Sequence, residues 1–350
     1  LSMCVRDAVN EMLGSLAEDA GIRREDVFQV CIVGNTCMHH LFLGISPASL
    51  VHAPYTPAVS ERLVLNAGDY GLAVQARAEL IMLSDIAGYV GADTCGCLLA
   101  IRQDQQEEIS LMIDIGTNGE MVLGNRERMV TCSTAAGPAF EGAKIECGMR
   151  GAAGAVDHVK YEDGKWNYTT VGNKPAVGLC GSGLIDLVAG LLDAGMLDEN
   201  GVLRSGQEKQ SVFILVPPER GGNERGVYLT QKDLGEVQLA KAAIAAGIQM
   251  LMERLGITED DICSVYIAGA FGNYMDPVSA GKIGLLPATL VKKVKPVGNA
   301  AGEGAKIALV NEKEMLEMDE LVRKIEFVEL AASADFQDHF IDELGFETGE

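Results

Sequence analysis

The sequence is short of positive charge, of aromatic side chains and of long apolar runs. Its 28 Lys and Arg are outnumbered by 50 Asp and Glu, giving a formal net charge of −22. This argues against binding to nucleic acid or to an anionic membrane surface, whose phosphates attract clustered Lys and Arg. The most apolar region, residues 80–101, is interrupted by Asp85, Asp93 and several glycines, so it does not predict a membrane span. With no signal pattern at the N-terminus, we expect a soluble, cytoplasmic protein.

The nine cysteines are odd in number and scattered through apolar segments. This distribution is typical of a reducing compartment with buried thiols. Only Cys95 and Cys97 are closely spaced, and no group of cysteines has the spacing of a zinc or iron–sulfur site. We therefore expect the cysteines to be structural.

A β-hairpin is predicted at residues 111–124. An apolar strand ends at Asp114, a tight turn follows, and a second apolar run ends at Gly124. Asp114 is placed to hold a hydrated Mg²⁺ ion at the strand end. Glu120, at the start of the second run, either assists it or faces solvent.

The turn of this hairpin has the composition of a phosphate-binding loop. Gly116 and Gly119 let the backbone approach an anion closely, and Thr117 and Asn118 add short donors. The hairpin thus predicts half of a nucleotide-phosphate site.

One helix–strand–glycine unit occurs twice in the chain. Residues 5–20 carry apolar side chains at helical spacing, and the apolar strand 27–33 leads into Gly34. A shift of 235 (269 − 34) places this unit on a later helix, the strand 262–268 and Gly269. The first copy's equivalent of Asp114 would then fall before residue 1 (114 − 235 = −121). We therefore expect a fragment that lacks a first phosphate loop.

A second correspondence, at a shift of 210 (298 − 88), joins two stretches of small residues. Both are predicted to be helices that cross with their backbones nearly touching, because side chains four positions apart share a helix face. The residues on the crossing faces are Gly88, Ala92 and Gly96 in the first helix and Ala301 and Ala305 in the second.

Three further glycine-rich segments are candidates for the site. Residues 134–143 are too rich in glycine and proline for a regular helix or strand, so we expect a loop there. Gly181, Ser182 and Gly183 open a helix whose free N–H groups suit an anion, although a plain N-cap at Ser182 explains them equally.

The third segment follows a buried strand, where α/β sheets place ligands. Glycines there would let a purine lie flat against the backbone. It consists of Gly269, Ala270, Phe271 and Gly272.

Together these features resemble the superfamily of acetate and sugar kinases, heat-shock chaperones and actin. The resemblance implies an α/β, ribonuclease H-like, duplicated two-lobe fold whose first lobe is truncated at its N-terminus. Residues 1–105 would be the remainder of the first actin-like lobe. Residues 106–350 would be the second, with an insertion around 155–230.

Five motifs in one order resemble, more specifically, the ATP-dependent reductive activators of corrinoid proteins. They are residues 33–40, 114–120, 136–143, 180–186 and 268–274. The resemblance implies ATP and Mg²⁺ as cofactors, Asp114 as the catalytic and metal-binding carboxylate, and a corrinoid protein partner whose Co(II) is reduced to Co(I). It also implies a [2Fe–2S] domain outside this chain, and it leaves a homodimer open.

Two other functions remain open from the sequence. One is a small-molecule kinase of the same superfamily, with Asp186 or Glu141 as a catalytic base. The other is a non-enzymatic, actin-like module that binds proteins. Stimulation of ATP hydrolysis by a small acid or sugar would favour the first, and partner binding without ATP would favour the second.

Overall fold

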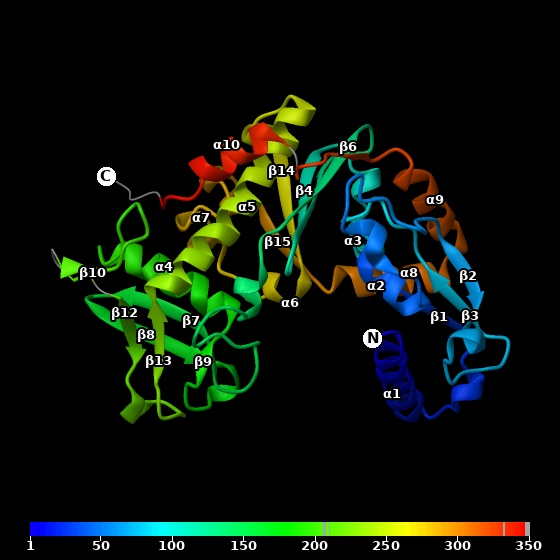
Figure 1. Cartoon of the computed structure of the whole chain (residues 1–350), viewed down its shortest axis with the longest axis horizontal. Helices are drawn as coiled ribbons and strands as arrows, with labels where there is room; N and C mark the ends of the chain where they lie inside the picture. Colours follow the sequence, from blue (N-terminus) through cyan, green and yellow to red (C-terminus); the bar gives the residue numbers. More distant parts are fainter. Residues whose placement is uncertain (206–207, 210, 332, 347–350) are drawn as a thin grey trace. The chain divides into compact units, whose positions relative to one another are not determined.

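The computed structural model describes residues 1–205, 208–209, 211–331 and 333–346. It divides into two compact units, whose helices and strands are labelled in Figure 1. The first unit comprises Leu1–Glu107, Asn125–Thr131 and Asn299–Phe327, and the second comprises Glu108–Gly124, Cys132–Gly298 and Val328–Glu350.

The first unit is built on a small mixed sheet in the order β1-β3-β2, in which β1 and β3 are parallel and β2 is antiparallel. Its helices and strands are α1 (Ser2–Ala20), β1 (Gln29–Ile32), α2 (Thr36–Leu43), β2 (Leu63–Asn66), β3 (Glu79–Met82), α3 (Ala92–Ile101), α8 (Ala300–Val310), α9 (Glu312–Val322) and β16 (Glu326–Phe327). The helix predicted at 5–20 and the strand at 27–33 are thus present as α1 and β1.

The predicted crossing of two small-residue helices is confirmed within the first unit as α3 against α8. A Cβ atom on Gly304 would lie 1.9 Å from the Gly96 carbonyl oxygen, and one on Gly96 would lie 2.6 Å from the Ala301 carbonyl oxygen. The backbones therefore touch without side chains between them.

The extent of these two helices was predicted wrongly. Gly88 lies outside α3, which begins at Ala92, and Gly88 instead packs against the Tyr55 carbonyl oxygen, 2.1 Å from an ideal Cβ position. The second helix begins at Ala300, because the Asn299 side chain caps it by accepting a bond from Gly302 N.

The second unit contains the predicted hairpin and the second copy of the repeated unit. Its sheet runs β15-β14-β4-β5, with β4 and β5 antiparallel and β14 parallel to both β4 and β15. The elements are β4 (Ile109–Ile115), β5 (Gly119–Gly124), β7 (Ala155–Glu162), β8 (Lys165–Thr170), β9 (Gly178–Leu179), α4 (Gly181–Asp193), β10 (Arg204–Ser205), β11 (Glu208–Lys209), β12 (Val212–Val216), β13 (Val227–Thr230), α5 (Gln231–Leu255), β14 (Ile262–Ala268), α6 (Gly269–Gly272), α7 (Pro277–Lys282), β15 (Val294–Gly298) and α10 (Ala334–Asp342). Strand β6 (Met129–Thr134) starts in the first unit, where it pairs with β16, and ends in the second.

Helix α5 packs along this sheet (Figure 1). A Cβ on Gly247 would lie 2.3 Å from the Met121 methyl carbon, and one on Gly119 would lie 3.2 Å from an Ile244 side-chain carbon. The hairpin is therefore held on a buried, close-packed layer, which fixes the position of its turn.

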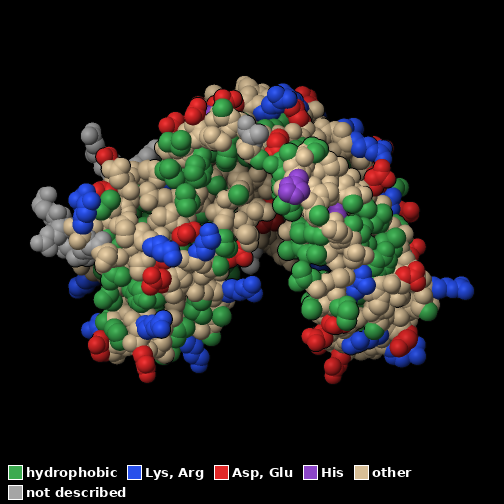
Figure 2. Space-filling model, viewed as in Figure 1, with side chains coloured by type: hydrophobic (Ala, Val, Ile, Leu, Met, Phe, Trp, Pro, Cys, Tyr) green, Lys and Arg blue, Asp and Glu red, His purple; other side chains and the backbone are tan. Residues whose placement is uncertain are grey.

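Among the described residues, no helix combines the length and the apolar character needed to cross a bilayer. On the face shown in Figure 2, Lys and Arg are interspersed with Asp and Glu in each unit rather than gathered in one broad patch.

Candidate functional site

The centre of the candidate site is the edge of the sheet where β4 and β14 end together. Asp114 and Ala268 are paired in the parallel ladder, so Gly269 begins beside the Asp114 carboxylate. Gly269 has φ +86°, and a Cβ there would lie 3.0 Å from Asp114 Oδ1. Glycine at 269 thus satisfies a left-handed backbone and also leaves space next to the carboxylate.

The turn after Asp114 is closed by its own backbone. Gly116 N donates to the Asn118 carbonyl oxygen at 2.9 Å. Gly119 is buried, and a Cβ there would lie 2.9 Å from Thr134 Oγ1, so packing alone explains this glycine. Thr117 is exposed, and its side chain points away from the turn toward Glu141.

Glu120 lies on the same side of the sheet as Asp114. The two residues are directly opposed in the antiparallel ladder of β4 and β5, and such pairs project their side chains to one face. Ser133 Oγ donates to Glu120 Oε1 at 3.4 Å. Two carboxylates therefore share the face of the sheet at which the turn begins.

The loop predicted at 134–143 contains one 3-10 turn, Pro138–Glu141, and contacts the hairpin turn through Thr117. Gly137 N donates to the Thr117 carbonyl oxygen at 2.8 Å, and Thr117 Oγ1 donates to Glu141 Oε1 at 2.7 Å. The sequence allows Glu141 either a role as a catalytic base or a plain loop role, and it does not predict the contact with Thr117, because 24 residues separate the two.

Phe140 of this loop joins the two glycine motifs of the unit. Its ring stacks on Phe271 of α6, with centroids 5.7 Å apart and planes at 20°. Its carbonyl oxygen would lie 2.0 Å from a Cβ on Gly181 at the start of α4. The loop, α4 and α6 therefore form one packed cluster beside the hairpin turn.

The start of α4 is tightly packed. Ser182 is 2% exposed, its Oγ lies 3.4 Å from Cys180 Sγ, and a Cβ on Gly183 would meet the Val156 carbonyl oxygen at 2.2 Å. Cys180 is the N-cap residue, so the alternative of an N-cap at Ser182 is wrong. Close backbone packing accounts for both glycines of the motif.

The motif after β14 forms the short helix α6. A Cβ on Gly272 would lie 2.6 Å from an Ile267 side-chain carbon, so this glycine also serves packing. Phe271 is half-buried against Phe140. Ala270 lies between these residues in the helix, and its side chain is outside those described.

Asp186, weighed as a catalytic base, is held by neighbours. Its Oδ2 lies 3.1 Å from His158 Nδ1 and accepts from Val159 N at 3.3 Å. Burial raises the pKa of this carboxyl group, while bonds from Ser279, His158 and Val159 act in the opposite direction. Asp186 therefore ties α4 to β7.

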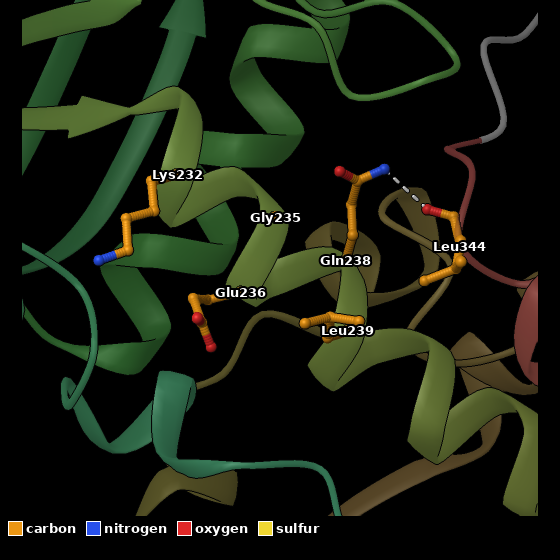
Figure 3. A pocket seen from close by; sticks show the side chains of 6 residues that line it. All are labelled: Lys232, Gly235, Glu236, Gln238, Leu239 and Leu344. Atoms are coloured by element: carbon orange, nitrogen blue, oxygen red, sulfur yellow. Dashed lines mark hydrogen bonds between the residues drawn. The ribbon is translucent and has the colours of Figure 1, made fainter.

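A shallow groove lies along α5 beside the C-terminal segment (Figure 3). Gln238 Nε2 donates to the Leu344 carbonyl oxygen at 2.9 Å across it. Lys232 extends away from the other labelled side chains. The groove shares no residue with the hairpin site.

The hairpin edge fits a nucleotide with a hydrated cation. A side chain at residue 269 would fill the space beside Asp114, and a hydrated Mg²⁺ needs only one or two protein carboxylates. Among the described residues, no group of three or more His, Cys, Asp or Glu is arranged to hold a metal ion directly.

Comparisons with known proteins cover both units. The model of a family described as "C-terminal domain of RACo the ASKHA domain" matches residues 108–350, and one described as "RACo middle region" matches residues 1–106.

Two curated relatives are similar over most of the chain. The corrinoid activation enzyme RamQ of Eubacterium limosum is 34% identical over 96% of this chain and 59% of its own length. The [Co(II) methylated amine-specific corrinoid protein] reductase of Methanosarcina barkeri is 30% identical over 77% of this chain and 52% of its own length.

A solved structure, titled "Reductive activator for corrinoid,iron-sulfur protein", superposes with a TM-score of 0.89 at 37% identity. It covers 99% of this chain and 56% of the solved chain. The chain thus spans little more than half the length of the relatives it matches. The actin-like resemblance of the fold is confirmed, and the chain belongs to the RACo family, of which it comprises the middle region and the C-terminal ASKHA domain.

Proposed function

We propose that this chain is the ATP-binding part of an activator that reduces a corrinoid protein from Co(II) to Co(I). The relatives are named for corrinoid activation and for reduction of a Co(II) corrinoid protein, which supports this assignment. The observation that carries it is the adjacency of Asp114 and Gly269 at the shared end of β4 and β14. It brings a cation-binding carboxylate to the edge of a backbone motif suited to a nucleoside.

In this proposal each part of the edge has a separate task. Asp114 orients a hydrated Mg²⁺ and the attacking water, with Glu120 on the same face supporting it. The backbone N–H groups of Thr117, Asn118 and Gly119 would hold phosphate oxygens, and Gly116 shapes the turn because its own N–H is bonded to the Asn118 carbonyl oxygen. ATP bound there would supply the free energy for an uphill electron transfer.

The nucleoside end lies along the second glycine motif. Gly269, Ala270, Phe271 and Gly272 provide the shelf for the adenine. Gly181, Ser182 and Gly183 are buried, and Gly181 lies against both Phe140 and Phe271. We assign to them the shape of the shelf rather than direct contact with the nucleotide.

The electron would come from a [2Fe–2S] centre outside these residues. All nine cysteines are free thiols, and the described residues contain no cluster of metal-binding side chains. The residues of this chain therefore do not fit such a centre. Free thiols also agree with a cytoplasmic location.

The function is tested by anaerobic reduction of a Co(II) corrinoid protein from the same source, followed by visible absorption. Ti(III) citrate supplies electrons to a full-length protein in which this chain is joined to its [2Fe–2S] domain, and ATP is present or absent. We expect Co(I) to accumulate only with both this protein and ATP, and Asp114→Asn to suppress it. An equal yield without ATP would refute the proposal.

A further inference from the structure

The contact between Thr117 and Glu141 determines how the hairpin turn presents its hydroxyl group. Glu141 is exposed, and a carboxylate oxygen only accepts hydrogen bonds. Thr117 must therefore donate its proton to Glu141 Oε1 across the 2.7 Å bond. The lone pairs of Thr117 Oγ1, and not its proton, remain for a ligand at the turn.

The loop that carries Glu141 is fixed at both ends. Gly137 has φ +78° and its N–H is bonded to the Thr117 carbonyl oxygen. Gly142 has φ +81°, and a Cβ there would lie 2.5 Å from Met149 N. The loop is therefore held in one conformation, and Glu141 is presented to Thr117 by rigid backbone.

Glu141 also lies close to the turn itself. Its Oε1 is 3.7 Å from the position that a Cβ on Gly116 would take. A negative charge at this place repels a bare phosphate group and attracts a cation. Both the carboxylate and the acceptor hydroxyl thus favour phosphate that arrives with its metal ion.

We propose that Glu141 is a positioning residue that acts through Thr117 and makes the turn select the Mg²⁺ complex of ATP over free ATP. The inference rests on the proposed nucleotide site and assigns it a substrate form. Thr117, which the sequence suggested as a phosphate donor, becomes an acceptor. The phosphate donors of the turn are then its backbone N–H groups.

The test is the affinity of the 350-residue chain for ATP by isothermal titration calorimetry, with excess Mg²⁺ and with EDTA. For the parent chain we expect Mg²⁺ to tighten ATP binding roughly tenfold or more. Thr117→Val and Glu141→Ala should each reduce this ratio several-fold, and the double variant should reduce it no further than Glu141→Ala alone. Thr117→Ser keeps the hydroxyl donor and should retain most of the ratio, whereas Glu141→Gln keeps an acceptor without the charge and should retain only part of it.

Two controls separate positioning from a general structural loss. Adenosine affinity should be unchanged in every variant, because the nucleoside shelf is intact. Glu224→Ala removes an exposed carboxylate in a loop outside the site and should leave the Mg²⁺ ratio unchanged.

The outcomes distinguish this inference from the proposed function. If the parent chain binds neither ATP nor adenosine, the nucleotide site itself is overturned. ATP binding without dependence on Mg²⁺, or a ratio unaffected by Glu141→Ala, would overturn the role of Glu141 alone.

Discussion

The two copies of the helix–strand–glycine unit differ in what accompanies the strand. In the second unit, β14 pairs on one side with β15 and on the other with β4, which carries Asp114. In the first unit, the described residues give β1 a single strand partner, β3. The glycine that follows differs as well, because Gly269 has a left-handed φ and borders a carboxylate, whereas Gly34 has neither feature.

From this comparison we infer that the repeated unit is a scaffold and that the hairpin beside its second copy provides the proposed site. In both copies the strand follows a capped turn, in which Asp26 and Asp261 hold the backbone N–H three residues earlier. Only the second copy, among the described residues, also carries the Asp-x-Gly-Thr hairpin.

The largest effect is expected where two backbones touch. Gly304→Ala would place a methyl group 1.9 Å from the Gly96 carbonyl oxygen, so we expect the first unit to lose about 3 kcal/mol or more of stability. Gly235→Ala, in α5 of the second unit with open space around it, should instead add about 0.5–1 kcal/mol. Chemical denaturation followed by circular dichroism measures both, and equal effects of the two substitutions would contradict the packed crossing.

The next effect compares the two glycines that follow the strands. Gly269→Ala forces a left-handed backbone on a side chain and fills the space beside Asp114, and it should weaken ATP binding roughly tenfold or more. The matched Gly34→Ala places its Cβ 3.4 Å from Met38 Cβ, an ordinary contact, and should leave ATP affinity unchanged. Titration calorimetry decides, and similar losses in both variants would remove the distinction between the copies.

A smaller effect concerns the exposure of β1. Burial raises the pKa of the Cys31 thiol to about 11, whereas Cys4, Cys37 and Cys263 are exposed. Because the thiolate is the reactive form, iodoacetamide at pH 8 should label Cys31 more slowly than the three exposed cysteines, by a factor of roughly five or more. Peptide mass spectrometry gives the order of labelling, and early labelling of Cys31 would show that β1 is more open than the structure indicates.

The smallest effect is expected at the two capped turns, which are held by Asp26 and Asp261. Bonds within each turn lower the pKa of the Asp26 and Asp261 carboxyl groups, led by Arg23 for the first and by the Thr258 backbone for the second. A carboxyl group whose pKa is lower in the folded state stabilises above its ordinary pKa and loses this contribution as the pH falls. Asp26→Asn and Asp261→Asn should therefore lower the melting temperature slightly at pH 7, with the difference shrinking below about pH 4. A difference that grows on acidification would contradict these caps.

Local patterns predicted the elements of the fold well. Apolar periodicity located α1, β1, the hairpin and β14, and the duplication indicated the crossing at Gly96 and Ala301. The pattern failed at Gly88, because a run of small residues does not show that Gly88 packs against Tyr55 and that the helix begins only at Ala92.

The site was only partly predictable. Asp114 and Gly269 followed from motifs at strand ends, since parallel strands bring such ends together. The packing roles of Gly181, Gly183 and Gly272, and the bond from Thr117 to Glu141, depend on contacts between segments far apart in sequence. A glycine that serves packing and one that admits a ligand look the same in a sequence.

The most direct test of the central claim is titration of Mg²⁺ and ATP into the parent chain and into Asp114→Asn. If the carboxylate beside Gly269 belongs to a nucleotide site, the parent chain binds ATP saturably at one site. The variant then loses affinity for ATP by a factor of roughly ten or more, while its melting temperature is unchanged. Equal affinity in the two proteins, or no binding by the parent chain, would contradict it.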